Sequence, residues 1–261
     1  MPKSPSPIPW MGSKRRLAPT ILERMPEHTC YVELFAGSAA VLFARPEPAK
    51  VEVVNDLDGE LINLFRILKH HLVEFVQQFR WSITSRQMWK WLDDTPPETL
   101  TDIQRAARFY YLHRLGFGGK AVGRTFGYSP TAAPRINFVR IEEALSDVHQ
   151  RLAQVLVEQL PWQDCVRRYD RPGTLFFCDP PYLGLAGYVG KKWELEDFEE
   201  LATVLGSIQG KALLTVNDHP DLRRVFGAFA FDHLETRYTV GSLQGKTKPA
   251  SELLFRTWEK S

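Results

Sequence analysis

Cysteine and long apolar runs are both scarce in this sequence. Its three cysteines, Cys30, Cys165 and Cys178, have neither CxxC spacing nor a nearby histidine pair, so they support no disulfide framework and no structural zinc site. The first residues lack the apolar core of a signal peptide. No stretch reaches the roughly 18 uncharged apolar residues that span a bilayer. We therefore expect a soluble, cytoplasmic protein that binds neither a metal nor a membrane.

An excess of charge of one sign is also missing. The 33 Lys+Arg and 31 Asp+Glu residues give a formal net charge of +2, which excludes a polybasic or acidic disordered chain as the whole protein. With 44% hydrophobic residues in 261, the chain can bury a full core. If the protein binds nucleic acid, its basic charge must be localised.

The order of the predicted elements indicates an α/β fold. Apolar runs predict strands over 30–35, 51–54, 174–178 and 212–216, and helical periodicity predicts helices over 17–24, 59–71 and 195–208. Such alternation is typical of a doubly wound, Rossmann-like parallel sheet. The last segments, 237–240 and 251–258, predict a terminal hairpin pair with a glycine-rich connection.

The middle of the chain has a different pattern. Residues 73–157 lack the alternation of strand and crossover, and show helical periodicity over 75–91, a Pro-Pro break at 96–97 and a further helix over 103–115. We interpret 73–157 as an inserted, mainly helical subdomain, and 1–72 with 158–261 as one catalytic domain. Three tryptophans are expected to pack inside the insert, Trp81, Trp89 and Trp91.

Polar residues follow the predicted strands, where ligands bind in a doubly wound sheet. They are Glu33 to Gly37, Asn55-Asp56, Asp179 to Tyr182 and Asn217-Asp218. The turn Phe35 to Ala39 has one glycine where a dinucleotide fingerprint has three, and it lacks a P-loop ending. About 20 residues later, Asp56 is placed to bind ribose hydroxyls; the alternative is that it caps a helix. An adenosyl ligand without a pyrophosphate fits both features.

The segment Asp179-Pro180-Pro181-Tyr182 carries the most chemistry. Two prolines make it extended and rigid just after a strand, and the preceding strand favours a functional role over a chance surface loop. An adenine amino nitrogen has its lone pair delocalised into the ring. Acceptance of its two N–H bonds by the Asp179 carboxylate and the Pro180 carbonyl would favour the pyramidal nitrogen of a transfer transition state.

This chemistry requires the base to leave the duplex, because the target atom is inaccessible in the stack. Tyr182 is expected to stack on the flipped base. A cytosine-carbon methyltransferase instead needs a cysteine nucleophile, commonly after proline, and none of the three cysteines follows a proline.

Taken together, six segments resemble the Dam-like group (D12 class, alpha-type motif order) of N6-adenine-specific DNA methyltransferases. In the family's order, these are Trp10-Met11-Gly12-Ser13-Lys14-Arg15, Glu33 to Ala39, Asn55-Asp56, Arg105 to Phe109, Asp179 to Tyr182 and Glu252-Leu253-Leu254. The resemblance covers almost the whole chain. It implies S-adenosylmethionine as methyl donor and a target-recognition role for the insert.

The resemblance also implies residue roles. Trp10, Gly12 and Lys14 help to hold the cofactor, Phe35 and Gly37 line its pocket, Asp56 binds the ribose, Asp164 with Cys165 lies near the adenine ring, and Glu33 and Asp179 complete the predicted cofactor-binding set. For Lys14 the alternative is a solvated basic N-terminus. Ala39 departs from the family, which usually has a second glycine there, and this methyl group is expected to affect affinity more than activity.

The segment from Arg105 to Arg140 contains seven basic residues and no Asp or Glu, interleaved with aromatics, a composition suited to phosphate contact and stacking. The alternative is a solvated basic helix whose aromatics form a core, which we favour for Tyr110 and Tyr111. His113 is expected on a helix face near the phosphates. The predicted DNA-binding residues are Arg114, Lys120, Arg124, Arg135 and Asn137.

The leading hypothesis is a DNA adenine methyltransferase acting on double-stranded DNA. It would be an orphan enzyme or the methylating half of a restriction system with a cognate restriction endonuclease as partner, and we expect a monomer in solution. Two alternatives are an RNA adenine N6-methyltransferase and a non-catalytic, cofactor-dependent regulator that binds nucleic acid. The Asp179 segment argues against the regulator, because a pure binder has no need of that acid.

Overall fold

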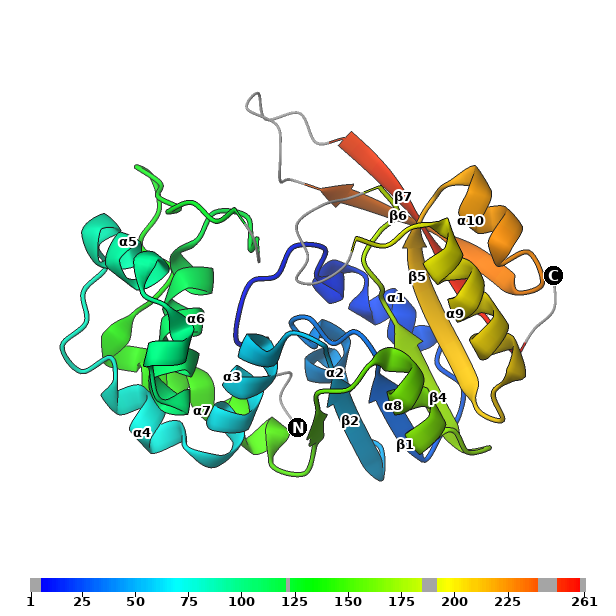
Figure 1. Ribbon diagram of the computed structural model, residues 1–261, viewed down its shortest axis with the longest axis horizontal. Coiled ribbons are helices and arrows are strands. Elements are labelled where there is room, and N and C mark those ends of the chain that lie inside the picture. Colours follow the sequence, from blue (N-terminus) through cyan, green and yellow to red (C-terminus); the bar gives the residue numbers. More distant parts are fainter. Residues whose placement is uncertain (1–5, 121–122, 185–191, 239–247, 259–261) are drawn as a thin grey trace.

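A computed structural model describes residues 6–120, 123–184, 192–238 and 248–258. Within these residues, seven strands form one sheet in the order β3-β2-β1-β4-β5-β7-β6 (Figure 1). The parallel strands are β1 (Cys30–Glu33), β2 (Val51–Asn55), β3 (Leu156–Glu158), β4 (Thr174–Cys178) and β5 (Lys211–Asn217), and β6 (Ala230–Tyr238) with β7 (Lys248–Arg256) is antiparallel. The predicted doubly wound sheet is confirmed.

Alternate residues of the central strands supply two apolar layers. Tyr31 and Phe177 face one side, which is covered by α1 (Ala18–Glu23), α2 (Ala40–Ala44) and α3 (Gly59–His70). Val32 and Phe176 face the other, which is covered by α8 (Trp162–Tyr169), α9 (Leu195–Ser207) and α10 (Pro220–Val225). All four of these strand side chains are 3% exposed or less, so both faces of the sheet lie in the core, as parallel sheets require.

Two strands differ from the sequence predictions. β3 begins at Leu156, inside the segment expected to be helical insert, and pairs with β2 in register Val54 to Val157. β6 begins at Ala230, well before the predicted residue 237, and pairs along its whole length with β7. The predicted terminal hairpin is therefore present but longer, and its connection lies outside the described residues.

Four helices and α3 form a block beside the sheet (Figure 1). They are α4 (Leu72–Gln77), α5 (Arg86–Asp94), α6 (Asp102–Leu115) and α7 (Ile141–Leu152), and short 3-10 turns occur at η1 (Lys14–Arg16), η2 (Pro97–Thr99) and η3 (Phe138–Arg140). α3 packs on α6 and α7, so it joins the block to the sheet. Tyr110 and Tyr111 of α6 are buried, which confirms their predicted place in the core.

The expected continuous helical pattern over 75–91 is wrong. The chain leaves α4 after Gln77 and starts α5 at Arg86, where the Ser85 hydroxyl accepts a hydrogen bond from the Met88 N–H as an N-cap. Trp81 precedes α5, and Trp89 and Trp91 lie two positions apart within it, so these two side chains face different sides of the helix. Trp89 is 6% exposed, as predicted, whereas Trp81 and Trp91 are 85% and 61% exposed and do not pack in the core.

In the described ranges, none of the helices is long and apolar enough to cross a bilayer.

Candidate active site

The ends of β1, β2 and β4 meet at one pocket of about 260 Å³, as the parallel sheet predicts. The predicted cofactor residues that line it are Trp10, Lys14, Glu33, Phe35, Gly37, Asp56 and Asp179. Of the predicted catalytic segment, Asp179 and Pro181 reach the pocket wall. The structure therefore brings together residues that lie far apart in the sequence, such as Trp10 and Asp179, which are 169 positions apart.

The turn after β1 brings the backbone of Gly37 close to the indole of Trp10. Gly37 has φ +48°, and a Cβ there would lie 2.8 Å from the Trp10 Nε1 atom, so only glycine fits without displacing the indole. Ala39 also has a left-handed backbone, with φ 51° and ψ 39°, and it is fully buried at the start of α2. The usual family glycine is thus replaced at a position that strains an alanine backbone.

Glu33 supports this turn from below. Its Oε1 accepts hydrogen bonds from the Leu42 N–H at 2.6 Å and from the Tyr31 hydroxyl at 2.9 Å, which ties α2 to β1. Burial raises the pKa of Glu33 to about 7, against the opposing effect of these two donors. The carboxylate is therefore engaged in shaping the wall of the pocket.

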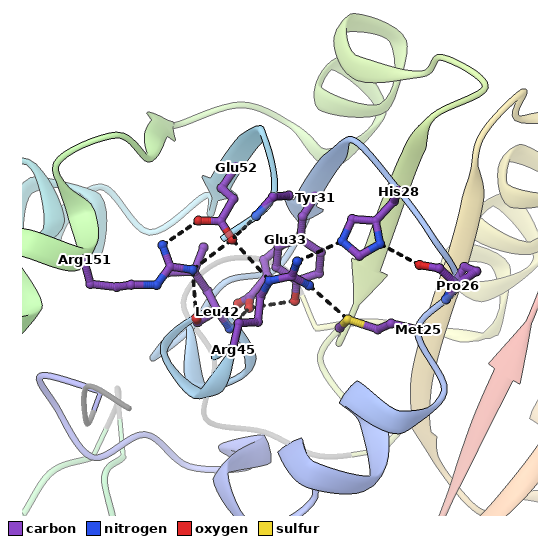
Figure 2. A network of polar contacts seen from close by, with 10 residues as sticks. Met25, Pro26, His28, Tyr31, Glu33, Leu42, Arg45, Glu52 and Arg151 are labelled. Carbon is purple, nitrogen blue, oxygen red and sulfur yellow. Dashed lines mark hydrogen bonds and ion pairs between the residues drawn. The ribbon is translucent and has the colours of Figure 1, made fainter. Parts of the chain in front are cut away.

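A buried ion network lies next to Glu33 (Figure 2). Glu52 of β2 binds the Arg151 guanidinium through both carboxylate oxygens, at 2.5 and 2.8 Å, and its Oε1 lies 3.2 Å from the Arg45 Nε. Arg45 also contacts His28 and Met25. Since Arg151 belongs to α7, this network fastens the helical block to β2, the strand that Asp56 directly follows.

Asp56 and Asp58 follow β2, and the structure shows which of the two caps the next helix. Asp58 caps α3, accepting from the Glu60 and Leu61 N–H groups, so the capping alternative for Asp56 is wrong. Asp56 instead accepts from the Gly37 N–H at 2.9 Å and from the Asp58 N–H at 3.0 Å. Burial raises the pKa of Asp56 to about 6.

Asp179, which is partly exposed, forms an ion pair with the buried Lys14. The Lys14 Nζ lies 2.7 Å from both carboxylate oxygens, and the Thr215 hydroxyl donates to Oδ1 at 2.8 Å. Burial raises the pKa of Asp179, and Lys14 acts in the opposite direction. The Lys14 side chain is 3% exposed, which rules out the alternative of a solvated basic N-terminus. Gly12 contributes its carbonyl to the Lys14 Nζ at 2.8 Å.

Tyr182 and Glu252 complete this charged cluster. The Tyr182 hydroxyl donates to Glu252 Oε2 at 2.6 Å, Glu252 Oε2 lies 3.7 Å from the Lys14 Nζ, and that ammonium sits 4.8 Å from the centre of the Tyr182 ring. Both side chains are buried. The sequence did not predict a site role for Glu252 or Thr215. In the antiparallel register, Thr215 of β5 lies opposite Leu254, and Glu252 of β7 lies opposite Asn217, the last residue of β5.

Trp10 connects the pocket to the helical block. Its ring stacks on His113 of α6 at 5.2 Å, and the following Met11 N–H donates to the Gly119 carbonyl at 2.9 Å. His113 is 1% exposed, and burial, followed by the charge of Arg124, lowers its pKa to about 3. Its expected position near phosphates is wrong, because α6 turns it inward onto the indole.

Aromatic rings that the sequence analysis missed form another wall. The centre of the Phe35 ring lies 6.5 Å from that of Trp162 and 5.3 Å from that of Trp193, and both tryptophans line the pocket. Asp164 and Cys165 are absent from the described lining. Asp164 forms an ion pair with Arg167, and Cys165 is buried in the core with its thiol pKa raised to about 12. The chain touches the pocket instead at 160–163, just before and at the start of α8.

Several basic residues of the acid-free segment have structural partners. Arg105 pairs with Glu60 and Asp102, and Arg140 pairs with Glu143. Arg108 donates to the carbonyls of Leu92 and Asp93, which end α5. The acid-free composition therefore reflects packing as well as surface charge.

The predicted DNA-binding residues differ in exposure. Lys120, Arg135 and Asn137 are exposed, and Asn137 also caps η3. Arg114 donates to the Arg135 carbonyl at 2.5 Å, so the two hold one loop at the end of α6. Arg124 is partly buried: burial lowers its pKa, while the nearby Asp93, Asp58 and Glu60 carboxylates oppose that change.

Known proteins match the chain over nearly its full length. The sequence model of the D12 class N6 adenine-specific DNA methyltransferase family matches residues 10–240. The retron Ec67 DNA adenine methylase of Escherichia coli is 25% identical over 95% of this chain and 89% of its own length. The DNA adenine methylase of Escherichia coli (strain K12) is 23% identical over 97% of this chain and 95% of its own length.

Proposed function

Because this chain belongs to the D12 class N6 adenine-specific DNA methyltransferases, we propose that it moves the methyl group of S-adenosylmethionine to an adenine flipped out of duplex DNA. The observation that carries this proposal is the shared pocket of Asp56 and Asp179. One acid suits a ribose diol and the other suits an exocyclic amine, and no covalent enzyme intermediate is needed.

The pocket residues fit an adenosyl methyl donor. The Asp56 carboxylate accepts N–H groups of the turn and keeps lone pairs for hydroxyl donors, and the rings of Phe35, Trp162 and Trp193 offer apolar faces to a purine. Gly37 admits close approach of a ligand to the backbone. When bound, the sulfonium donor supplies an electrophilic methyl group.

Asp179 and Pro180 act on the target nitrogen. The Asp179 carboxylate and the Pro180 carbonyl accept its two N–H bonds, which favours the pyramidal geometry of the transition state. The nitrogen–methyl bond forms as the sulfur–methyl bond breaks, and the surplus proton leaves the nitrogen toward Asp179. Stacking of Tyr182 on the base stays a prediction; its ring is 7% exposed and lies beneath Lys14.

Two substitutions of Asp179 test this role. Asp179→Ala should lower turnover about a hundredfold or more, the loss typical of a missing transition-state acceptor, while cofactor affinity changes by a small factor. Asp179→Asn should retain a trace, because its amide oxygen still accepts a hydrogen bond. Methyl transfer to duplex DNA and to RNA of the same sequence is measured with labelled donor, and cofactor binding by calorimetry. Near wild-type turnover of Asp179→Ala would refute the proposal.

We assign DNA contact to Arg114, Lys120, Arg124, Arg135 and Asn137. Loss of the exposed Lys120 as Ala should weaken all duplexes equally and reduce the salt slope by about one counterion. Loss of a base-reading residue, for which we propose Arg124, should cost about 1 to 3 kcal/mol on the preferred site alone. Binding isotherms on cognate and scrambled duplexes at several salt concentrations separate these effects. Unchanged binding and salt slope in both variants would exclude this surface.

The oligomeric state, cellular location and association with a restriction enzyme remain proposals. We propose a cytoplasmic enzyme that is monomeric in solution, which sedimentation in the presence and absence of duplex DNA tests. A relative from Lactococcus lactis subsp. cremoris, 23% identical over 95% of this chain and 94% of its own length, is named Type II methyltransferase M1.LlaDCHI. Protection of DNA in cells against a restriction endonuclease encoded nearby would support that partnership.

A further inference from the structure

The pocket has beside it a buried acid that the proposed transfer leaves without a task. Glu252 is 1% exposed and lies opposite Asn217, so the final strand β7 delivers it to the carboxyl end of β5. A buried carboxylate is unfavourable unless it is paired and hydrogen-bonded. Burial raises the pKa of Glu252, and Lys14 acts against that rise. An apolar residue would fill the same space without this penalty, so the contacts of the Glu252 carboxylate must explain why an acid is buried at this position.

The Glu252 carboxylate contacts two groups of the site, the Tyr182 hydroxyl and the Lys14 ammonium. Glu252 accepts the Tyr182 hydroxyl at 2.6 Å and lies 3.7 Å from the Lys14 ammonium, which is 2.7 Å from Asp179. One cation thus serves two carboxylates, with the shorter distance on Asp179. A carboxylate bound to a lysine alone is a weaker acceptor for a substrate amine, and a second negative charge on the same cation loosens that hold.

We infer that Glu252 is a positioning residue for methyl transfer: it fixes the Tyr182 ring and shares the Lys14 ammonium with Asp179, which keeps the Asp179 carboxylate available to the target amine. The inference rests on the proposed role of Asp179. Glu252 is not among the described residues that line the pocket. Its effect passes through Lys14 and Tyr182, both of which it contacts directly.

Charge removal at Glu252 has a signed consequence. Among the described residues, the titratable groups around Asp179 are Lys14 from η1, Cys178 from β4, Glu252 from β7 and the adjoining Tyr182. Burial raises the thiol pKa of Cys178, so this group stays neutral. In Glu252→Gln, one of the two carboxylates near the Lys14 ammonium loses its charge, so that ammonium acts more strongly on Asp179 and the pKa of Asp179 must fall.

The experiment compares kcat against pH at saturating donor and duplex DNA for wild type and Glu252→Gln. The acidic limb, set by protonation of Asp179, should move to lower pH by about half a unit or more. The plateau kcat should fall about tenfold, with the dissociation constant of S-adenosylmethionine within threefold of wild type. Glu158→Gln is the matched control. Glu158 also accepts a tyrosine hydroxyl, that of Tyr169 at 2.5 Å, but it belongs to the edge strand β3, which three strands separate from β5. The acidic limb of Glu158→Gln should not move.

A second measurement separates this inference from the proposed function. Carbon-13 NMR titration of aspartate carboxyls, with Asp179→Asn for assignment, reports the pKa of Asp179 without turnover. A lower pKa in Glu252→Gln supports the shared cation even if Asp179 has another role, and an unchanged pKa overturns it. The inference is also overturned if Glu252→Gln is active and the acidic limb of its kcat–pH profile lies at the same pH as in wild type.

Tyr182→Phe covers the case in which Glu252→Gln does not fold. This variant keeps the ring and its contact with Lys14, and loses only the hydroxyl bonded to Glu252. We expect kcat to fall several-fold with donor affinity unchanged, because the ring is no longer fixed. Wild-type kcat would show that Glu252 does not position Tyr182 and would overturn the inference.

Discussion

Replacement of Lys14 by Met isolates the balance of charge in the pocket. Met fills most of the lysine stem but removes the ammonium that lies 2.7 Å from Asp179 and 3.7 Å from Glu252. The buried Glu252 and the partly exposed Asp179 are then left without their shared cation. Removal of one partner of a fully buried pair typically costs 3 to 5 kcal/mol, so about 4 kcal/mol is the upper limit of the loss of stability here. Protonation of a carboxyl sets a ceiling on this penalty.

That ceiling depends on pH. About three units separate pH 7 from the ordinary aspartate pKa, and at about 1.4 kcal/mol each, protonation of Asp179 costs about 4 kcal/mol. In Lys14→Met the folded-state pKa of Asp179 rises far above its unfolded value. The folded state then binds more protons than the unfolded state, so stability falls as pH rises through this window. The deficit relative to wild type should shrink by about 1.4 kcal/mol for each unit of acidification.

Urea unfolding followed by tryptophan fluorescence, at one-unit steps from pH 5 to 8, measures this deficit. Lys90→Met is the control, because Lys90 forms an exposed pair with Asp94, and exposed pairs contribute little. Its stability should match wild type at every pH. A deficit in Lys14→Met that is constant with pH, or absent at pH 8, would refute the picture of two carboxylates that depend on one ammonium.

Three further predictions concern the cofactor acid, the ion network and the tryptophans. Burial raises the pKa of Asp56 to about 6, so calorimetry should show donor affinity falling about tenfold per unit below pH 6, and Asp56→Asn should bind more weakly without that dependence. Arg151→Met should lower the free energy of unfolding by about 3 kcal/mol in urea titrations, because Glu52 loses the ion pair with Arg151 and keeps its contacts with Arg45 and the Ala49 N–H. Trp89→Ala should cost about 3 to 5 kcal/mol, whereas Trp81→Ser should stay within about 0.5 kcal/mol because Trp81 is 85% exposed.

The apolar runs of the sequence predicted the strands of the sheet and the acidic residues that follow their carboxyl ends. Strand ends in a parallel sheet share one edge, so Asp56 and Asp179 could be placed in one pocket from strand positions alone. β3 escaped prediction because three residues directly after a helical segment show no period of their own. Trp81 was misplaced because one periodic run was interpreted as one helix, although Ser85 restarts the count at α5.

Charges that pair across the chain could not be predicted in this way. The basic run Lys14-Arg15-Arg16 is typical of a solvated segment, and Lys14 is buried because Asp179, 165 residues later, neutralises it. Glu252 is similarly defined by Tyr182, 70 residues earlier. Composition within a window of a dozen residues contains neither partner.

The place of β7 in the sheet affects the order in which the enzyme can be assembled during synthesis. β7 is the last strand in the chain, yet it lies between β5 and β6, and β6 has β7 as its sheet neighbour. Until β7 emerges, β6 has no strand to join and the edge of β5 stays open, a state in which exposed edges invite wrong pairing. Contacts between distant residues form slowly because long loops must close first. The nascent protein can therefore form the part of the pocket wall that follows β1 and β2 before β7 joins the sheet and brings Glu252 to the end of β5.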